Sequence, residues 1–305
     1  MDQKEYIKGL INGGGAFAIW GLLPLYWKTV SAISPYQVFS QRVVWSFVFV
    51  TVLMVYRGEW SLFIKLVSDR RNWGSAILPS MLISVNWLLF IWAVNSGFVI
   101  EASLGYYINP LVLTLLGLVF LKESLNKLQK TGIAFAFIGV VIKSFYYGKI
   151  PYVSFALAIS FALYGFMKKK SPLKSLYGLG FETLIAGLFL LPYLLFNEFT
   201  GIGITGNLPW HFWLKISLSG IFTAIPLIMF AEGTKRLPLS IMGFLQYIAP
   251  TGMLLLGVLV FGEPFDMVSA ISFGLIWIGL GFFSYSQYQL LSKGKKKRPD
   301  IPIQS

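Results

Sequence analysis

Ten apolar stretches of about 20 residues follow one another along this chain, which restricts it to a fold that crosses a lipid bilayer many times. A helix needs about 20 apolar residues to span the hydrocarbon core. The expected spans are residues 9–29, 36–56, 73–95, 99–121, 129–147, 150–167, 176–196, 212–232, 238–261 and 266–287. We therefore predict an all-α integral membrane protein with ten transmembrane helices. The first stretch is long and bulky, and we expect it to be retained rather than cleaved as a signal peptide.

The few charged residues are distributed unevenly between the two sides of the predicted bundle. Only 12% of the residues are charged, and their net charge is +13. Twenty of the 25 Lys and Arg fall in the termini and loops that share one side. Basic loops resist translocation, so this side is expected to be cytoplasmic, with both termini there. The net charge is then a sign of membrane orientation, and we expect a lipid bilayer, not nucleic acid, as the partner of these residues.

The residue inventory excludes several chemistries. The chain has no Cys and a single His, His211, which follows Pro209 and Trp210 and is interpreted as an interfacial residue. It also lacks the glycine-rich loop with a Lys that binds nucleotide phosphates. We therefore expect no metal site, no cofactor and no direct use of ATP. No cluster of acid and base residues is evident in the loops, so an enzyme is not expected.

The second half of the chain repeats the first at a spacing of 140 residues. The identical pairs are Tyr107/Tyr247, Ile108/Ile248, Pro110/Pro250, Leu115/Leu255, Leu116/Leu256, Gly117/Gly257, Glu123/Glu263, Ile138/Ile278, Gly139/Gly279 and Ser144/Ser284. With five spans per half, the second half is inverted in the membrane, as in many secondary transporters. We assign residues 1–148 to the first repeat, 149–288 to the second and 289–305 to a basic cytoplasmic tail.

Several longer strings match a known family. They are WGLLPLYWK at 20–28, QRVVWS at 41–46, NW at 86–87, WAVN at 92–95, EASLGYYINPL at 101–111, SFALYG at 160–165, TAIPL at 223–227 and LQYIAPT at 245–251. The chain resembles the RarD-type permeases, which are EamA-domain members of the drug/metabolite transporter superfamily, from about residue 9 to 290. The resemblance implies two inverted EamA repeats, a bacterial inner membrane location and a permease function without a defined substrate.

Two charged residues within predicted spans are the first candidates for a substrate site. Charges in a bilayer are costly, and those retained there are often functional. Arg42 and Glu182 lie at equivalent depths, 140 residues apart. Two alternatives stay open. In the first, Arg42 and Glu182 form a buried ion pair or act as separate anchors, and in either case they fix helix packing. In the second, Arg42 binds a substrate carboxylate or phosphate, and Glu182 binds an ammonium group or carries a coupling proton.

Polar and aromatic residues near predicted helix breaks complete the candidate site. Prolines are expected to interrupt helices beside the cavity, and they are Pro24, Pro110, Pro226 and Pro250. The polar candidates are Asn86, Tyr106, Asn109, Gln246 and Tyr247, and the aromatic ones are Trp20, Trp87 and Tyr164. The alternative is that these side chains only make hydrogen bonds between helices or pack together.

The sequence thus favours a permease that moves a small organic metabolite or an amphipathic, drug-like molecule, amino acids included, by alternating access. A proton gradient or the substrate gradient itself would drive transport. The alternative is a membrane sensor or an assembly subunit that does not transport. The sequence leaves open whether the protein is a monomer or a homodimer.

Overall fold

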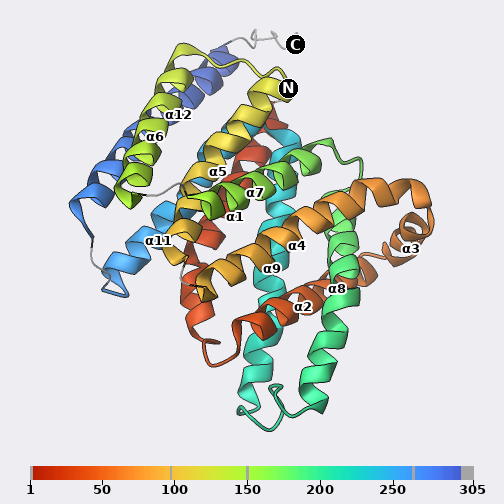
Figure 1. The fold of residues 1–305 in the computed structure, drawn as a ribbon. Helices are drawn as coiled ribbons and strands as arrows, with labels where there is room; N and C mark the ends of the chain where they lie inside the picture. Colours follow the sequence, from red (N-terminus) through yellow and green to blue (C-terminus); the bar gives the residue numbers. More distant parts are fainter. Residues whose placement is uncertain (1–2, 97, 149–150, 263–264, 297–305) are drawn as a thin grey trace, which may run out of the picture.

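The computed structural model describes the chain except for residues 1–2, 97, 149–150, 263–264 and 297–305. The repeat partner Glu263 and the end of the basic tail therefore lie outside the described residues. The described part is helical and contains no strand (Figure 1). Its helices are α1 (Gln3–Lys28), α2 (Pro35–Tyr56), α3 (Trp60–Ser68), η1 (Arg70–Asn72), α4 (Trp73–Asn95), α5 (Val99–Phe120), α6 (Lys127–Tyr147), α7 (Tyr152–Lys170), α8 (Ser175–Phe199), α9 (His211–Arg236), α10 (Leu239–Gln246), α11 (Ile248–Leu259) and α12 (Met267–Lys296).

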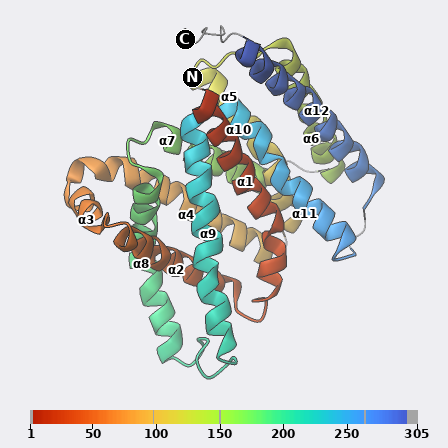
Figure 2. The ribbon, with the colours of Figure 1, turned by 180° about the vertical axis from the view of Figure 1, so that it is seen from behind.

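Eight segments of the described chain are long and apolar enough to cross a membrane. They are α2, α4, α5, α6, α8, α9, the α10–α11 pair and α12. The all-α membrane fold is therefore confirmed. The expected spans 9–29 and 150–167 correspond to α1 and α7, which are outside this set. Helix α1 packs mainly on α9 and α11 (Figure 2), and α7 packs mainly on α5 and α4 (Figure 1), so less of the surface of these two helices needs to be apolar. Their crossing of the membrane stays a prediction.

The two halves of the chain pack around an approximate two-fold axis. The contact of α1 with α9 has its counterpart in the contact of α7 with α4, and the contact of α2 with α9 has its counterpart in that of α8 with α4. Three helix pairs lie across the axis, because α2 packs on α8, α5 on α10 and α6 on α12. The repeat detected in the sequence is thus also a repeat of helix contacts.

The pair α6 and α12 defines the direction of this axis. A methyl group on Gly279 would lie 2.5 Å from the Gly132 carbonyl oxygen, and one on Gly139 would lie 2.7 Å from the Ser272 carbonyl oxygen. At the spacing of 140 residues, Gly139 is equivalent to Gly279 and Gly132 to Ser272. The two helices are antiparallel, because the later residue of α6, Gly139, contacts the earlier residue of α12, Ser272. A two-fold axis that exchanges antiparallel helices is perpendicular to them. The second half is therefore inverted relative to the first, and close backbone approach requires small residues here.

The structure corrects the expected helix breaks. Helix α1 continues through Pro24, α5 through Pro110 and α9 through Pro226. In the ninth span the chain instead interrupts the helix at Tyr247, between α10 and α11, and Pro250 lies in the first turn of α11. A proline costs least in a first turn, where its missing N–H has no partner to lose. The start of α10 is capped by Glu123, whose carboxylate accepts hydrogen bonds from the backbone N–H groups of Leu239 (2.7 Å) and Ser240 (2.9 Å).

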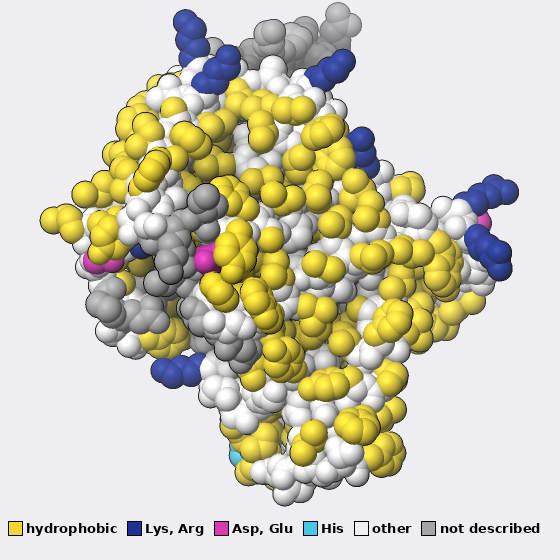
Figure 3. All heavy atoms as spheres, viewed as in Figure 1, with side chains coloured by type: hydrophobic (Ala, Val, Ile, Leu, Met, Phe, Trp, Pro, Cys, Tyr) yellow, Lys and Arg dark blue, Asp and Glu magenta, His cyan; other side chains and the backbone are white. Residues whose placement is uncertain are grey.

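A short amphipathic helix, α3, follows α2 and was not expected from the sequence. It buries Phe63, which packs on Phe181, and exposes Leu62 and Ile64. Figure 3 shows Lys and Arg side chains gathered at this projecting corner and at the end that carries the termini, with a mostly hydrophobic surface between them. This distribution suits a protein whose middle contacts lipid tails.

A capping box begins α6, and Asn126 of this box also donates from Nδ2 to Ser286 Oγ of α12 at 2.6 Å. The Asn126 side chain accepts a hydrogen bond from the Gln129 backbone N–H, and the Gln129 side chain accepts one from the Asn126 backbone N–H, each 2.9 Å long. We expect Asn126→Ala to lower the free energy of unfolding by about 1 kcal/mol, because the cap acceptor is lost. Asn126→Asp keeps that acceptor and should remain near wild type in thermal unfolding of the detergent-solubilised protein. Equal loss in both variants would contradict a capping role.

Candidate functional site

A cavity of about 440 Å³ lies between the two halves. Its wall is formed by α1, α2, α4 and α5 of the first half and by α7, α9, α10 and α11 of the second. This volume lies within the range of about 300–1,000 Å³ that is usual for sites that bind small molecules. Its polar lining residues are Arg42, Asn86, Tyr106, Asn109, Thr223 and Gln246, and its large aromatic ones are Phe17, Trp20, Trp27, Trp87, Phe90 and Phe161.

Arg42 extends from the second turn of α2 into this cavity. Its guanidinium carbon lies 4.2 Å from the centre of the Trp87 ring and 5.7 Å from that of Trp27. Its Nε is buried and has no hydrogen-bond partner in the described chain. None of the four ion pairs between described residues includes Arg42. The tryptophan faces offset part of the charge through cation–π attraction, but no carboxylate of the described chain forms an ion pair with it.

Glu182 does not pair with Arg42 and does not line the cavity. Its Oε1 lies 2.6 Å from Lys168 Nζ, and its Oε2 accepts a hydrogen bond of 3.0 Å from the Tyr164 hydroxyl. The Lys168 and Glu182 side chains are each only 3% exposed. The alternative of an Arg42–Glu182 ion pair is therefore wrong. Lys168, one of the basic residues that the charge distribution places on the cytoplasmic side, is buried as the partner of Glu182.

Four further predicted site residues lie outside the cavity lining. Tyr164 stacks on Phe230 with ring centres 6.0 Å apart, behind the cavity wall. Tyr247 packs in a second apolar cluster, where its hydroxyl donates to the Tyr107 carbonyl oxygen at 3.2 Å. Pro110 and Pro226 lie within continuous helices and are not part of the lining either. The remaining predicted residues all line it, and they are Trp20, Pro24, Arg42, Asn86, Trp87, Tyr106, Asn109, Gln246 and Pro250.

Two of the three amide side chains that line the cavity, Asn86 and Asn109, are held by hydrogen bonds to the protein, and two, Asn109 and Gln246, keep an unpaired oxygen. Asn109 donates from Nδ2 to the Ala158 carbonyl oxygen at 2.8 Å, which leaves Oδ1 without a partner among the described residues. Gln246 Oε1 and Thr223 Oγ1 likewise have no partner there. Asn86 donates to the Leu157 carbonyl oxygen and to Ser160 Oγ, both at 2.9 Å. Buried polar atoms usually have partners, so the unpaired ones point to a ligand or water.

Among the lining residues that sequence reasoning missed within the family strings, Trp27 and Thr223 bear most directly on the polar site. Trp27 contacts Arg42, and Thr223 contributes one of the unpaired oxygens. Trp27 lies seven positions after Trp20, two helical turns along the same face. Lys168 and Tyr164, four positions apart, share a face of α7 in the same way. Helical spacing from the predicted residues Trp20 and Tyr164 could therefore have identified Trp27 and Lys168 from the sequence.

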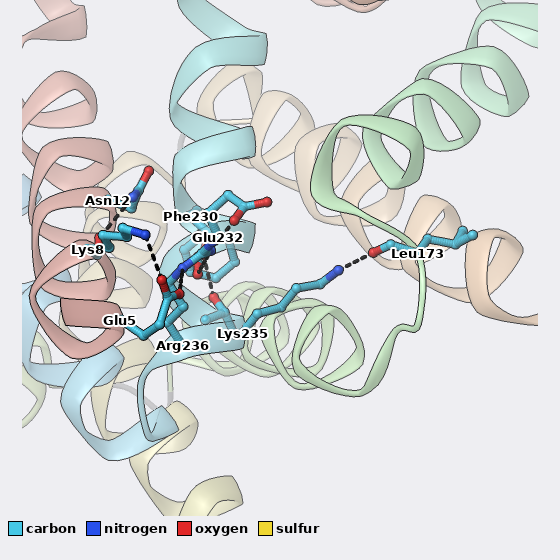
Figure 4. A network of polar contacts seen from close by, with 9 residues as sticks. Glu5, Lys8, Asn12, Leu173, Phe230, Glu232, Lys235 and Arg236 are labelled. Carbon is cyan, nitrogen blue, oxygen red and sulfur yellow. Dashed lines mark hydrogen bonds and ion pairs between the residues drawn. The ribbon is translucent and has the colours of Figure 1, made fainter. Parts of the chain in front are cut away.

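An ionic network lies away from the cavity, at the end of the bundle that carries the termini (Figure 4). Arg236 Nε lies 2.9 Å from Glu5 Oε2, and Arg236 also pairs with Glu232. Lys235 reaches the Leu173 carbonyl oxygen between α7 and α8. The network therefore joins α1, α9 and the α7–α8 connection. Hydrogen bonds from Lys8 and Arg236 lower the pKa of the exposed Glu5 carboxyl group, so it stays ionised at neutral pH.

The fold and the cavity define a class of protein, a polytopic membrane transporter built from two inverted repeats. The chain matches the EamA-like transporter family over residues 7–145 and again over residues 150–285. It therefore belongs to this family and is a RarD-type permease of the drug/metabolite transporter superfamily.

Curated relatives and a solved structure agree with this membership. The chain is 47% identical to the uncharacterized transporter YojE of Bacillus subtilis, over 94% of this chain and 97% of that protein. It is 37% identical to Protein RarD of Escherichia coli, over 93% and 96% of the two chains. A solved structure titled "Crystal structure of protein" superposes with a TM-score of 0.69 at 21% identity, over 90% of this chain and 96% of that one, and so shows the same fold.

Proposed function

We propose that this membrane transporter moves a small organic molecule through its central cavity by alternating access. The observation that carries the proposal is the position of the cavity between two halves related by an inverted two-fold axis. Halves of this kind can exchange conformations, which opens a central site to one side and then to the other. The cavity is lined by a single chain, so we propose that a monomer is sufficient for transport and that a homodimer would carry two independent cavities.

The proposed orientation places both termini in the cytoplasm of a bacterial cell with the chain in its inner membrane. The bias of 20 in 25 basic residues supports it, as does the basic surface near the termini in Figure 3. Residues 1–148 and 149–288 would be the two exchanging halves, and 289–305 would lie against anionic headgroups. The cavity uses the part of α1 near Lys28 and the first half of α5, whereas the ionic network closes the cytoplasmic end. We therefore assign this structure to an outward-facing state.

Substrate contacts are proposed for the residues that line the cavity. Arg42 would bind a charged or strongly polar group, Asn86, Tyr106, Asn109 and Gln246 would donate or accept hydrogen bonds, and Trp20 and Trp87 would pack on the substrate body. Glu182 is engaged by Lys168 and Tyr164, which supports a structural role and argues against proton coupling through this residue. The substrate gradient would then drive transport. The family and the relatives named as transporters support a transporter rather than an enzyme.

Counterflow tests this proposal. Protein reconstituted into liposomes loaded with unlabelled solute should accumulate the same labelled solute from outside, at least several-fold above empty liposomes. The panel contains organic acids, amino acids, amines and nucleosides, so that the test does not depend on the substrate class. A matched preparation of Gly220→Ala controls for leakage, because this change is expected to disrupt helix packing. A solute that binds to the purified protein but shows no counterflow would favour the alternative of a non-transporting sensor.

A further inference from the structure

The cavity contains an uncompensated positive charge. Arg42 is the only charged residue among those that line it in the described chain. Its Nε has no hydrogen-bond partner among the described residues, and its guanidinium group lies over the rings of Trp87 and Trp27 rather than beside a carboxylate. A charge in a low-dielectric site is stable only when it is paired and hydrogen-bonded. The described chain thus provides a cation in the cavity, and the anion that would pair with it has to come from a ligand.

The second half of the molecule shows what the first half lacks. Glu182, the equivalent of Arg42, has both a counter-charge in Lys168 and a hydroxyl donor in Tyr164. The sequence FAIWG at 17–21 matches FALYG at 161–165, so Trp20 corresponds to Tyr164 and Pro24 to Lys168. Both Trp20 and Pro24 line the cavity, and neither can neutralise a guanidinium. The pseudo-symmetric arrangement is thus complete in one half. In the other half, Trp20 and Pro24 occupy the corresponding positions, and no negative group of the described residues lines the cavity beside Arg42.

We propose that the substrate is a small organic monoanion whose carboxylate binds Arg42; this rests on the transport function proposed above. Guanidinium and carboxylate groups match in shape and form two parallel, charge-assisted hydrogen bonds. A single cation balances a single negative charge, so a phosphate dianion would leave one charge unpaired in a mainly apolar cavity. A cation would face Arg42 with no carboxylate among the lining residues to hold it. Among amphipathic, drug-like molecules, organic acids are therefore favoured over cations.

The rest of the cavity specifies the body of the acid. Trp20 and Phe161 form an edge-to-face pair with centres 5.9 Å apart, and Trp87 and Trp27 lie beside the guanidinium. These rings provide a surface for an aromatic or other flat apolar group. The unpaired oxygens of Asn109, Gln246 and Thr223 need hydrogen-bond donors. The substrate class is therefore a carboxylate with a flat apolar body and at least one hydroxyl or amide N–H group.

Matched probes test the sign of the charge. The set is 3-phenyllactate, its neutral amide 3-phenyllactamide, the cation phenethylamine and the zwitterion phenylalanine, together with benzoate and lactate. Binding to purified protein is measured by thermal shift and by the fluorescence of the cavity tryptophans. We expect 3-phenyllactate to bind at least tenfold more tightly than the amide and phenethylamine not to compete. A preference for the amine or amide, equal affinity for all probes, or no binding of any carboxylate would overturn the proposal. Tighter binding of phenylalanine than of 3-phenyllactate would do the same, because it requires a site for the ammonium group.

Variants then assign the effect to Arg42. Arg42→Gln should weaken carboxylate binding at least tenfold and change amide binding less than twofold, so that the preference for the acid disappears. Lys28→Gln is the matched control, because Lys28 lies on Phe261 outside the cavity lining and should leave binding unchanged. Arg42→Lys keeps the charge and should retain part of the preference, which covers the case in which the glutamine variant does not fold. An unchanged preference in a folded Arg42→Gln protein would overturn the assignment.

The outcome of this test separates the two proposals. Carboxylate binding through Arg42 without counterflow would remove the transport proposal and keep the ligand class. Counterflow of amines or neutral solutes without carboxylate binding would keep transport and remove the ligand class.

Discussion

Replacing Glu182 with leucine is expected to lower the free energy of unfolding by about 3–5 kcal/mol, because it leaves the Lys168 ammonium group buried without a partner. The two side chains are 3% exposed and 2.6 Å apart, so solvent cannot replace Glu182, and among the described residues no other carboxylate forms an ion pair with Lys168. Tyr164 also loses the acceptor of its 3.0 Å hydrogen bond. Thermal or denaturant unfolding of the purified protein in detergent measures the loss.

The double variant Lys168→Met with Glu182→Leu distinguishes an unpaired charge from lost packing. Exchanging a buried ion pair for apolar residues of similar volume is often neutral, so the double variant should recover most of the lost stability. Glu5→Leu is the exposed control, since it breaks the ion pair with Arg236 at the surface of the bundle and should have a much smaller effect. A single variant as stable as wild type would mean that Lys168 reaches water, contrary to the burial described here.

The same pair of variants also tests the role of Glu182 in transport. Because Glu182 lies behind the cavity wall, the double variant should keep carboxylate binding and counterflow. Transport that loses its dependence on external pH in this variant would instead restore the alternative of a coupling proton on Glu182.

Hydropathy predicted the helices well because it reports the property that the bilayer selects. The expected spans 36–56 and 73–95 differ by at most one residue at either end from α2 (Pro35–Tyr56) and α4 (Trp73–Asn95). Hydropathy did not predict features that depend on helix packing or on amphipathic character. Helix α3 is amphipathic and too short to span a membrane, so a search for apolar stretches passes over it. The break at Tyr247 separates α10, which packs on α5, from α11, which packs on α1, while Pro24, Pro110 and Pro226 are accommodated inside their helices.

The sequence predicted which residue types form the candidate site, but it did not predict which side of each helix faces the cavity. Arg42, Asn86 and Gln246 were identified as polar groups in apolar helices, and all three face the cavity. Glu182 met the same criterion and faces the opposite way, because which side of a helix lines a cavity depends on its neighbours in space. Lys168 begins a run of three lysines, and such a run is usually interfacial, so its buried position required the contact between α7 and α8 to be known.

The inverted repeat also explains why a lone cation is retained in the cavity. Equivalent positions in the two halves lie in matching helix contacts. Ser80 of α4 donates to the Glu182 carbonyl oxygen of α8, and Gly220 of α9, the equivalent of Ser80, accepts a hydrogen bond from Ser46, one turn after Arg42 on α2. The halves differ in the side chains placed on this common frame. One half has an internal ion pair, and the other has a cation that faces the space available to a substrate.

Gly220→Ala is expected to be the most disruptive small substitution, because α2 and α9 touch through their backbones at this point. The added methyl carbon would lie 2.3 Å from the Trp45 carbonyl carbon, 2.4 Å from its oxygen and 2.7 Å from the Ser46 nitrogen. These are backbone atoms, which cannot rotate away, so the two helices must separate. We expect a loss of about 3 kcal/mol, at the upper end of the usual cost of overpacking.

The effect should extend from stability to ligand binding. Separation of α2 from α9 breaks the 3.2 Å hydrogen bond from Ser46 to the Gly220 carbonyl oxygen and displaces the turn of α2 that holds Arg42. Gly187→Ala on α8 is the matched control, since nothing lies within 4 Å of its added methyl group, and it should be neutral or stabilising by up to about 1 kcal/mol. Thermal unfolding and titration with 3-phenyllactate measure both effects. If Gly220→Ala unfolded at the wild-type temperature and bound the acid normally, α2 and α9 would have to lie further apart than they do here, and the cavity wall described for Arg42 would be wrong.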